Sequence, residues 1–375
     1  MKQANPTAAI PLSRPFLGER EEELVLEVLR SGHLSLGSAI PRFEGMFAAR
    51  VGAPYAAAVS SGTAGLHLAA RIAGIGADDE VITSPYSFVA SANCFMYEGA
   101  RPVFADIDAR TFNLDPAAVE AAITERTRAV VAVDIFGYPC ELDELRAICD
   151  RHGLALIEDA CQALGAQYKD RPTGSGGHLT VFGFYPNKPI TTGEGGVVTT
   201  GSAEQLELLV SLRNHGRADT DGWLEHSWFG FNYRLTDVQA AIGIAQLEKF
   251  DLLMTMRAAA ADRYAALLAD VDGVSTLLPD DEDHRRSWFV YVVKLASGID
   301  RKRVIAMLED QGIQARPYLP CIHLQQYMRE RYGFREWMFP VAEETSRKTL
   351  ALPFFSGIEP EDQERVVEAL RSAIA

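Results

Sequence analysis

The chain has 375 residues, 47% hydrophobic and 23% charged, a composition typical of a soluble globular protein with one large domain and one smaller one. Its 36 Lys and Arg residues face 51 Asp and Glu residues, and the formal net charge of −15 argues against a nucleic-acid-binding protein, which would present a basic face. The charge does not exclude an anionic small ligand, because a local cradle can oppose the overall field.

The sequence shows no pattern for export, membrane insertion or metal binding. Residues 1–9 lack a basic segment followed by an apolar run, and no uninterrupted apolar stretch is long enough to span a membrane. The five cysteines and eight histidines match no metal-ligand spacing, so we expect reduced thiols and no metal. We therefore expect a cytoplasmic protein without nucleic-acid or membrane partners.

The first half of the chain alternates between predicted strands and helices. Residues 1–13 are expected to form a loose lead-in. Helices are predicted over 19–29, 40–50, 65–73, 88–97 and 141–151, and strands over 55–59, 80–83, 102–105, 129–135 and 154–157. Strands that are apolar on both faces and alternate with helices indicate a mostly parallel sheet covered on each side.

One stretch, 181–200, places a single lysine on a tight loop. Residues 181–184 and 197–200 predict strands, and Pro186 ends the first because it cannot donate a ladder hydrogen bond. Beside aromatic residues, Lys188 can lose proton affinity by desolvation and act as a nucleophilic amine that forms a Schiff base. The alternative interpretation is an ordinary surface lysine on a hairpin.

The rest of the chain predicts a smaller α+β domain joined through a long helix. Helices are expected over 205–214, 236–269 (with a break near 250–251), 301–310 and 361–373, and strands over 288–295 and 313–316. We therefore predict a large α/β domain at residues 1–250 and a smaller C-terminal domain at residues 251–375.

Four features fall where an open α/β sheet binds ligands, at the carboxyl ends of its strands. They are the Ser-Gly-Thr-Ala turn at 61–64, Phe88 early in a helix, Asp159 at a strand end, and Lys188. A phosphate-binding helix start, a stacking aromatic, an acid for a ring nitrogen and an amine are the set that pyridoxal 5′-phosphate (PLP) needs. Taken singly, the turn is more often a helix cap, Phe88 more often core, and Asp159 more often a capping or solvated residue.

Six motifs in this chain resemble the DegT/DnrJ/EryC1/StrS family of PLP-dependent sugar aminotransferases. They are SGTAGLHL at 61–68, SFVASAN at 87–93, IEDACQALGA at 157–166, FYPNK with TTGEGG at 184–196, RNHG at 213–216 and GFNYRLTDVQAA at 230–241. The resemblance covers nearly the whole chain. It implies an aspartate-aminotransferase-type α/β fold (fold type I), with a mostly parallel mixed sheet in the large domain, and a homodimer whose active sites are shared between subunits.

By motif position, the resemblance also implies roles for single residues. Lys188 is similar to the family's aldimine lysine and Asp159 to its pyridinium partner, while Gln162 would flank the cofactor ring and Phe88 would stack on it. The residues at its phosphate-binding positions are Gly62, Thr63, Gly183 and, reaching from the neighbouring subunit, Asn232.

Two positions depart from the family pattern. Gly183 stands where the family commonly has a serine whose hydroxyl binds phosphate, so the grip would rest more on backbone amides and on the partner chain. Gly177-His178 replaces a frequent Gly-Asp, and for His178 a structural role and a role at the site entrance both stay open. Because Lys188 is retained where the family's sugar dehydratases typically have histidine, the resemblance favours amino transfer over dehydration.

The resemblance implies that an amino group moves from L-glutamate to a keto group of a nucleotide-linked sugar, by ping-pong transamination. Candidate substrate residues are Tyr185, Arg316 and His323, each of which has a packing or surface role as its alternative. Two other functions stay open: an aminotransferase for a keto-cyclitol or other cyclic ketone, and a PLP-fold regulatory or sensory protein with little turnover.

Overall fold

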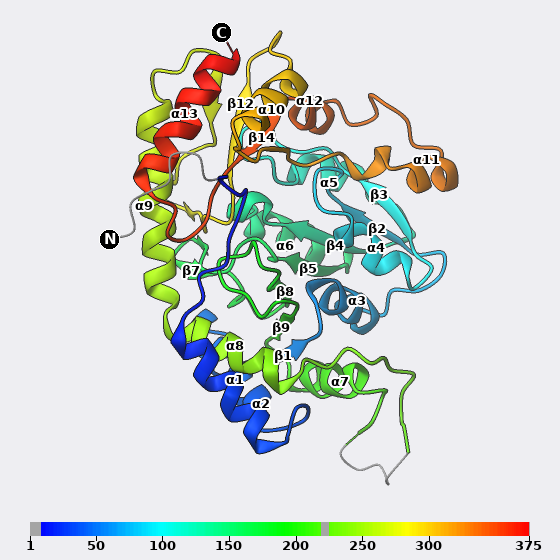
Figure 1. Cartoon of the computed structure of the whole chain (residues 1–375). Coiled ribbons are helices and arrows are strands. Elements are labelled where there is room, and N and C mark those ends of the chain that lie inside the picture. The colour runs from blue at the N-terminus through cyan, green and yellow to red at the C-terminus, as the bar shows by residue number, and fades with distance from the viewer. Residues whose placement is uncertain (1–8, 219–224, 375) are drawn as a thin grey trace.

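A computed structural model describes residues 9–218 and 225–374 (Figure 1). In this part of the chain, seven strands form one large mixed sheet. In order across it they are β1 (Tyr55–Val59), β9 (Gly196–Thr200), β8 (Leu179–Gly183), β5 (Ala155–Asp159), β4 (Thr127–Val133), β2 (Glu80–Thr83) and β3 (Arg101–Phe104). The five strands from β8 to β3 pair in parallel, and β9 pairs antiparallel with both β8 and β1, which confirms the predicted mostly parallel sheet.

Helices cover both faces of this sheet. They are α1 (Glu19–Ser31), α2 (Ala39–Val51), α3 (Gly62–Ile72), α4 (Ala90–Met96), α5 (Pro116–Ala121), α6 (Leu142–His152), α7 (Ala203–Arg213) and α8 (Asp237–Glu248). In β4, Val131 packs on one face with the α3 and α4 side chains, while Val130 and Ala132 pack on the other with α6. Strand residues alternate between faces, so a strand apolar at every position is buried on both sides.

The C-terminal part is built on a second, antiparallel sheet. Its strands are β10 (Val274–Thr276), β12 (Tyr291–Leu295), β14 (Thr349–Leu352) and β13 (Arg316–Pro317), in that order. Its helices are α9 (Phe250–Leu268), α10 (Arg301–Asp310), α11 (Gln326–Tyr332), α12 (Pro340–Lys348) and α13 (Pro360–Ile374). Only Lys249 separates α8 from α9, which confirms the predicted break. Figure 1 shows α9 running along one side of the molecule toward α13.

Short elements without a strong pattern were not predicted. Besides α5, α11, α12, β10 and β14, they are a small sheet of β6 (Gln167–Tyr168), β7 (Arg171–Pro172) and β11 (His284–Arg285), and the 3₁₀ turns η1 (Ile135–Gly137) and η2 (Ile322–Leu324). The predicted strand 129–135 ends earlier, at Val133, because η1 begins two residues later.

The expected loose lead-in is wrong for residues 10–12. Ile10 is buried in the C-terminal core and pairs with Ile313, and its amide donates to the carbonyl of Gly312 at 2.9 Å. The carbonyl of Leu12 accepts from the amide of Phe354 at 2.9 Å. The start of the chain therefore packs with the C-terminal sheet, while the division near residue 250 stays a prediction. Residues 1–8 lie outside the described part.

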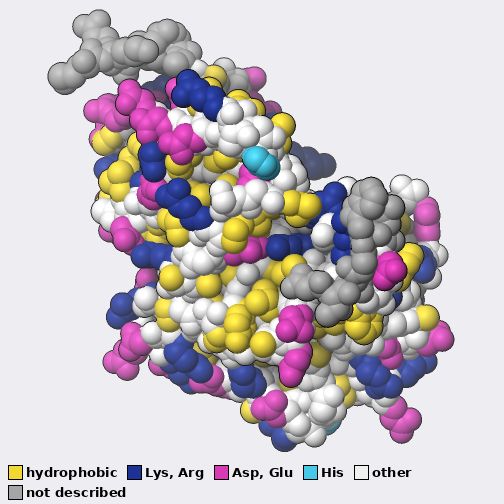
Figure 2. All heavy atoms as spheres, turned by 90° about the horizontal axis from the view of Figure 1, so that it is seen from below, with side chains coloured by type: hydrophobic (Ala, Val, Ile, Leu, Met, Phe, Trp, Pro, Cys, Tyr) yellow, Lys and Arg dark blue, Asp and Glu magenta, His cyan; other side chains and the backbone are white. Residues whose placement is uncertain are grey.

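Several general properties follow from the described residues. All five cysteines lie among them and are free, as predicted. No helix in this part of the chain is both long and apolar enough to cross a membrane. On the face shown in Figure 2, acidic and basic side chains are interspersed, with hydrophobic side chains between them.

Candidate active site

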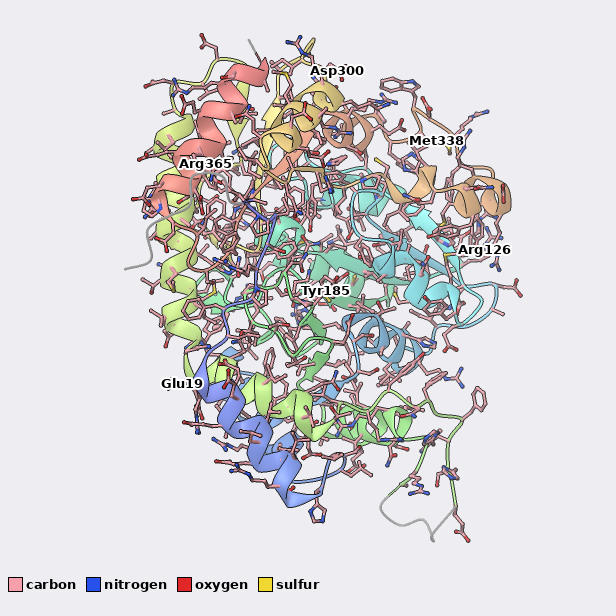
Figure 3. The ribbon with its side chains drawn as sticks, viewed as in Figure 1. Glu19, Arg126, Tyr185, Asp300, Met338 and Arg365 are labelled. Atoms are coloured by element: carbon pink, nitrogen blue, oxygen red, sulfur yellow. The ribbon has the colours of Figure 1, made fainter. Side chains whose placement is uncertain are left out.

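A cavity of about 620 Å³ lies at the carboxyl ends of β5 and β8, where the start of α3 meets the loop between β8 and β9. Tyr185, which lines it, lies near the middle of the molecule in Figure 3. The predicted site residues that line the cavity are Gly62, Thr63, Phe88, Asp159, Gln162, Gly183, Tyr185 and Lys188. The fold thus brings together residues from four separate motifs at one place of a size typical for a cofactor or substrate.

The start of α3 forms one wall of this cavity. Ser61 caps the helix, since its hydroxyl accepts from the amide of Ala64 at 3.1 Å, so the ordinary capping interpretation is also realised. The amides of Gly62 and Thr63 lie in the first turn, where no carbonyl of the helix can accept from them. They remain available for an anion, which the helix dipole also favours.

Close backbone packing holds this helix start in place. A Cβ atom on Gly62 would lie 2.8 Å from Sγ of Cys161, and one on Gly196 would lie 2.9 Å from the amide nitrogen of Gly62. Glycine at both positions therefore allows β9 and the residue after β5 to approach the helix start. A side chain at either position would push this wall of the cavity apart.

Cys161 gives a physical reason for the glycine at position 183. A Cβ atom on Gly183 would lie 3.3 Å from Sγ of Cys161, closer than ordinary van der Waals contact. Burial, followed by the nearby carboxylate of Asp159, raises the pKa of Cys161 well above its usual value, so the thiol is neutral. Sequence analysis did not single out Cys161; the signal was its place two residues after Asp159 in the IEDACQALGA motif.

Asp159 ends β5 with its carboxylate held in one orientation. It is 5% exposed, and the hydroxyl of Ser91 donates to Oδ2 at 2.6 Å while the amide of Cys161 donates to Oδ1 at 3.2 Å. The hydroxyl of Ser91 also contacts that of Ser87 at 2.9 Å. Each carboxylate oxygen has a second lone pair, so Asp159 can still accept a proton donor from the cavity.

Lys188 lies on the loop between β8 and β9, as predicted. Its amide donates to the carbonyl of Tyr185 at 2.9 Å, and the amide of Phe184 donates to the carbonyl of Gly195 at 2.9 Å, so the loop is closed by its own backbone. Desolvation by burial lowers the pKa of Lys188, while the carboxylate of Asp159 acts in the opposite direction. The amine is therefore easier to deprotonate than that of a surface lysine, which argues against the hairpin-surface interpretation.

Phe88 and Gln162 flank the cavity from two other segments. Phe88 precedes α4 and does not lie within it, and its side chain is 60% exposed, so the core interpretation is wrong. Gln162 is buried, and its Oε1 accepts from the amide of Phe136 at 2.9 Å. That hydrogen bond leaves the amide group of Gln162 oriented by the backbone of η1.

Three of the predicted residues do not line the cavity. Asn232 is exposed and lies outside the lining of this cavity. Arg316 is exposed and pairs with Glu309. His323 is 0% exposed, and its Nε2 lies 3.2 Å from Oε1 of Glu343, so the predicted substrate contact of His323 is contradicted by its burial. The C-terminal residues that do reach the cavity are Tyr318 and Leu319, from the same Arg-Pro-Tyr-Leu-Pro motif.

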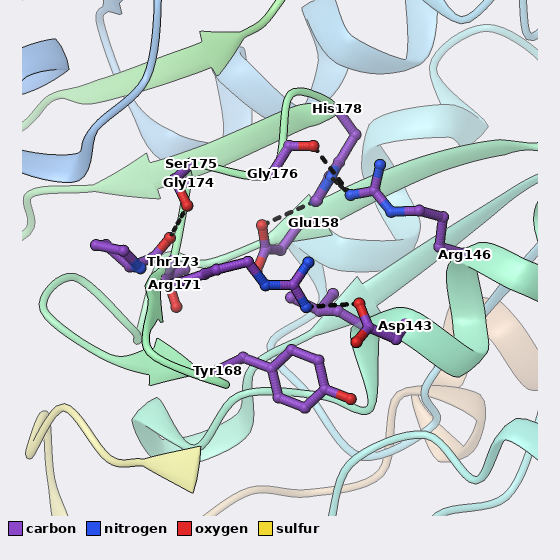
Figure 4. Close-up of a pocket in the computed structure, with 12 residues that line it drawn as sticks. Asp143, Arg146, Glu158, Tyr168, Arg171, Thr173, Gly174, Ser175, Gly176 and His178 are labelled. Carbon is purple, nitrogen blue, oxygen red and sulfur yellow. Dashed lines mark hydrogen bonds and ion pairs between the residues drawn. The ribbon is translucent and has the colours of Figure 1, made fainter. Parts of the chain in front are cut away.

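His178 lies in a separate small cavity, away from the site (Figure 4). Arg146 Nη2 donates to Nδ1 of His178 at 2.7 Å, and Nε2 of His178 lies 2.9 Å from Oε2 of Glu158. Because a guanidinium can only donate, the ring carries its proton on Nε2 and donates it to Glu158. These contacts indicate a structural role for His178 and leave none at the site entrance.

Next to His178, the carboxyl groups of Asp134 and Glu158 are both fully buried. Oδ2 of Asp134 and Oε1 of Glu158 are buried and have no donor. Burial, and then the charge of Glu158, raise the pKa of Asp134 well above its usual value. Burial acts to raise the pKa of Glu158 as well, but hydrogen bonding to His178 and Thr180 holds it below its usual value. We therefore expect Asp134 to be protonated in the folded state, with Glu158 as the acceptor of its proton.

We expect Asp134→Asn to stabilise the fold at alkaline pH. The pKa of Asp134 is raised in the folded state, so its contribution to the free energy of unfolding is full below the unfolded-state pKa of about 3.9 and falls as the pH rises above that value. An asparagine amide can donate the same hydrogen bond at any pH, because it does not need to bind a proton. The melting temperature of the variant should exceed that of the wild type by about 2 °C or more at pH 8, and the difference should vanish near pH 4. Thermal unfolding followed by circular dichroism across this range tests it.

The matched substitution in Glu158 is expected to lower the melting temperature. Glu158→Gln removes the charge that accepts from His178 and Thr180, so its melting temperature should fall at neutral pH. A lower melting temperature for Asp134→Asn at every pH would contradict the expected protonation of Asp134.

The donor set of the larger cavity fits PLP. It holds an amine (Lys188), a carboxylate at a strand end (Asp159), free amides at a helix start (Gly62 and Thr63) and an exposed aromatic face (Phe88). The glycines described above let β9 and the segment after β5 pack closely against the helix start, which keeps its free amides at the cavity wall, where a phosphate could bind.

Comparisons with known proteins agree with this arrangement. The DegT/DnrJ/EryC1/StrS aminotransferase family matches residues 15–371. The spore coat polysaccharide biosynthesis protein SpsC of Bacillus subtilis is 38% identical over 379 residues, covering 97% of each chain. Among solved structures, Helicobacter pylori PseC, an aminotransferase involved in the biosynthesis of pseudoaminic acid, is 31% identical with a TM-score of 0.92, covering 98% of this chain and 99% of PseC.

A further structural neighbour bears on the cofactor. Spr1654 from Streptococcus pneumoniae, solved in its PLP form, is 26% identical with a TM-score of 0.92, covering 97% of this chain and 98% of that one. These likenesses confirm the predicted aspartate-aminotransferase-type fold. The chain therefore belongs to the DegT/DnrJ/EryC1/StrS family of PLP-dependent aminotransferases, as its motifs predict.

Proposed function

We propose that this protein binds PLP in the 620 Å³ cavity and transfers an amino group from L-glutamate to a keto group of a nucleotide-linked sugar. The observation that carries the proposal is the convergence of Lys188, Asp159 and the open start of α3 in one cavity. The names of SpsC and PseC, which place those relatives in the biosynthesis of polysaccharide and of pseudoaminic acid, support a sugar as the acceptor.

When bound, PLP supplies an electrophilic carbonyl and an electron-accepting ring. The chain's own residues then orient and charge that ring. Asp159, fixed by Ser91 and by the amide of Cys161, would hold a proton at the ring nitrogen. Phe88 would stack on one face of the ring and Gln162 would flank it, while the amides of Gly62 and Thr63 bind the phosphate.

Lys188 would move the proton that amino transfer requires. Its lowered pKa would allow the ε-amine to take a proton from the α-carbon of the donor and pass it to the cofactor in the first half-reaction, and to carry a proton in the reverse direction in the second. One cavity would receive glutamate and the keto sugar in turn, so we expect ping-pong kinetics. Tyr185, 55% exposed at the cavity, and Tyr318 offer hydroxyl groups toward the acceptor.

A homodimer would complete the site. Asn232 is exposed on the chain that leads into α8, and nearby Trp228 and Phe229 expose 56% and 78% of their surfaces. Large exposed aromatic side chains are typical of interface residues. We propose that Asn232 reaches the cofactor phosphate of the partner subunit.

The absorbance spectrum of the purified protein tests the proposal. The yellow band of the bound cofactor should bleach when L-glutamate alone is added and return when a keto-sugar nucleotide follows. If the yellow band returned with a keto-cyclitol but with no sugar nucleotide, the acceptor would be a cyclitol and not a nucleotide-linked sugar. A yellow protein that no amino donor bleaches would indicate a sensory role, and no band after PLP is supplied would overturn the proposed site.

A further inference from the structure

Arg257, in the first half of α9, is buried without an acidic partner. Its side chain is 2% exposed, and among the described residues no carboxylate forms an ion pair with it. Burial lowers the pKa of Arg257 to about 10. Burying a cation without an anionic partner costs free energy. The hydrogen bonds that the guanidinium makes therefore indicate the role of this residue.

Among the described residues, the side chain of Arg257 donates hydrogen bonds only to backbone carbonyls of two distant segments. Nη1 donates to the carbonyls of Trp288 and Phe289 at 3.1 and 3.2 Å, and Nη2 donates to the carbonyl of Lys188 at 3.2 Å. The planar guanidinium thus joins the peptide of Lys188 to the segment just before β12. Lysine could not span both, because its donors radiate from one nitrogen atom.

The second joined segment carries the ring that faces the amine of Lys188. The Nζ atom of Lys188 lies 4.0 Å from the ring centroid of Phe289. A cation at this distance from a ring face is attracted by the ring quadrupole. The same two residues are therefore joined twice, through their carbonyls by Arg257 and through their side chains by the cation–π contact.

We propose that Arg257 and Phe289 are positioning residues for Lys188: Phe289 provides the surface on which the free ε-amine rests, and Arg257 holds the two peptides at the spacing that this contact requires. The importance of Lys188 in catalysis rests on the proposed function, but the position of its amine does not. Neither residue touches the cofactor or the substrate through this arrangement, so neither is assigned a catalytic role.

The first test needs neither cofactor nor activity. In the PLP-free protein with 13C-labelled lysines, the ε-CH2 signal of Lys188 should be displaced by the ring current of Phe289, and it is identified by its loss in Lys188→Ala. Phe289→Leu should return the signal to the position of an ordinary lysine, and Phe289→Tyr should retain the displacement. Phe355→Leu is the matched control, because Phe355 is also a buried ring beneath a cation, Arg14 at 5.0 Å, but lies against a different segment.

Arg257→Lys tests the carbonyl clamp, by which we mean the hydrogen bonds from Arg257 to the two backbone segments. In this variant we expect the Lys188 signal to move part of the way toward the position of an ordinary lysine and to broaden. Arg301→Lys is the control, since Arg301 also donates to two backbone carbonyls, those of Ser346 and Thr349, without contacting Lys188. If Arg257→Lys does not fold, the Phe289 variants decide the proposal alone.

A kinetic test then links position to turnover. In the PLP-loaded enzyme, Arg257→Lys and Phe289→Leu should each lower kcat by about 10- to 100-fold, with KM for the amino donor changed by less than threefold, because misplacing a reacting group costs rate more than binding. Phe289→Tyr should restore most of kcat. An undisplaced Lys188 signal in the wild type, or one that Phe289→Leu leaves in place, would overturn the proposal even if transamination is observed.

Discussion

Replacing Lys188 with alanine is expected to lower the rate of amino transfer by at least about 10³-fold, because Lys188 provides the only amine among the described residues that line the cavity. The fold should persist, since the loop is closed by backbone hydrogen bonds from Phe184 to Gly195 and from Lys188 to Tyr185, which alanine retains. Steady-state transfer from L-glutamate, together with thermal unfolding, measures both expectations.

Lys294→Ala serves as the matched control for this variant. Lys294 also lies near a phenylalanine ring, with Nζ 6.0 Å from the centroid of Phe112, but it lines no part of the cavity. Its turnover should equal that of the wild type. Unchanged turnover in Lys188→Ala would remove the lysine from the reaction and with it the proposed mechanism.

Asp159→Asn is expected to lower kcat by about 10³-fold, a loss in the range of removing an electrostatic partner of the reacting group. The neutral amide would keep the shape of the side chain and an oxygen to accept from Ser91, but it could not hold a proton at the ring nitrogen of the cofactor. Cofactor content, measured by absorbance, should fall much less than kcat.

The pH dependence of the same variant gives a second measurement. The Asp159 carboxylate acts to raise the pKa of Lys188, so its removal should lower that pKa further. The acidic limb of the kcat profile, which reports the enzyme with its donor bound and the Lys188 amine released, should therefore move to lower pH. Asp134→Asn, the same substitution just after the neighbouring strand β4, is the control and should leave both kcat and the profile unchanged. A comparable loss of kcat in Asp134→Asn would mean that the effect is structural.

Much of the site could be predicted from short stretches of sequence. The position of Lys188 follows from Pro186 and the glycines after it, because these residues restrict the backbone wherever they stand. The place of Asp159 at a strand end follows from the apolar run before it. The break between α8 and α9 was likewise predictable from local pattern.

The failures share a physical cause in long-range contacts. Residues 10–12 and β14 are short and weakly patterned, and their conformation comes from pairing with partners more than 30 residues away. His323 lies seven residues after Arg316, yet it packs against the rings of Phe104 and Phe339 with Glu343 as its partner. Which side of a turn faces a cavity depends on what packs behind it.

The sequence by itself determined the chemistry and the local backbone: the amine, the acid, the helix start, and the turns and strand ends that present them. These depend on residue type and on neighbours within a few positions. Only the tertiary structure decided how the site is supported. The fit of Cys161 against Gly62 and Gly183, and the clamp of Arg257 on Lys188, join residues 22 or more positions apart. Such contacts depend on packing between elements that only the complete fold brings together.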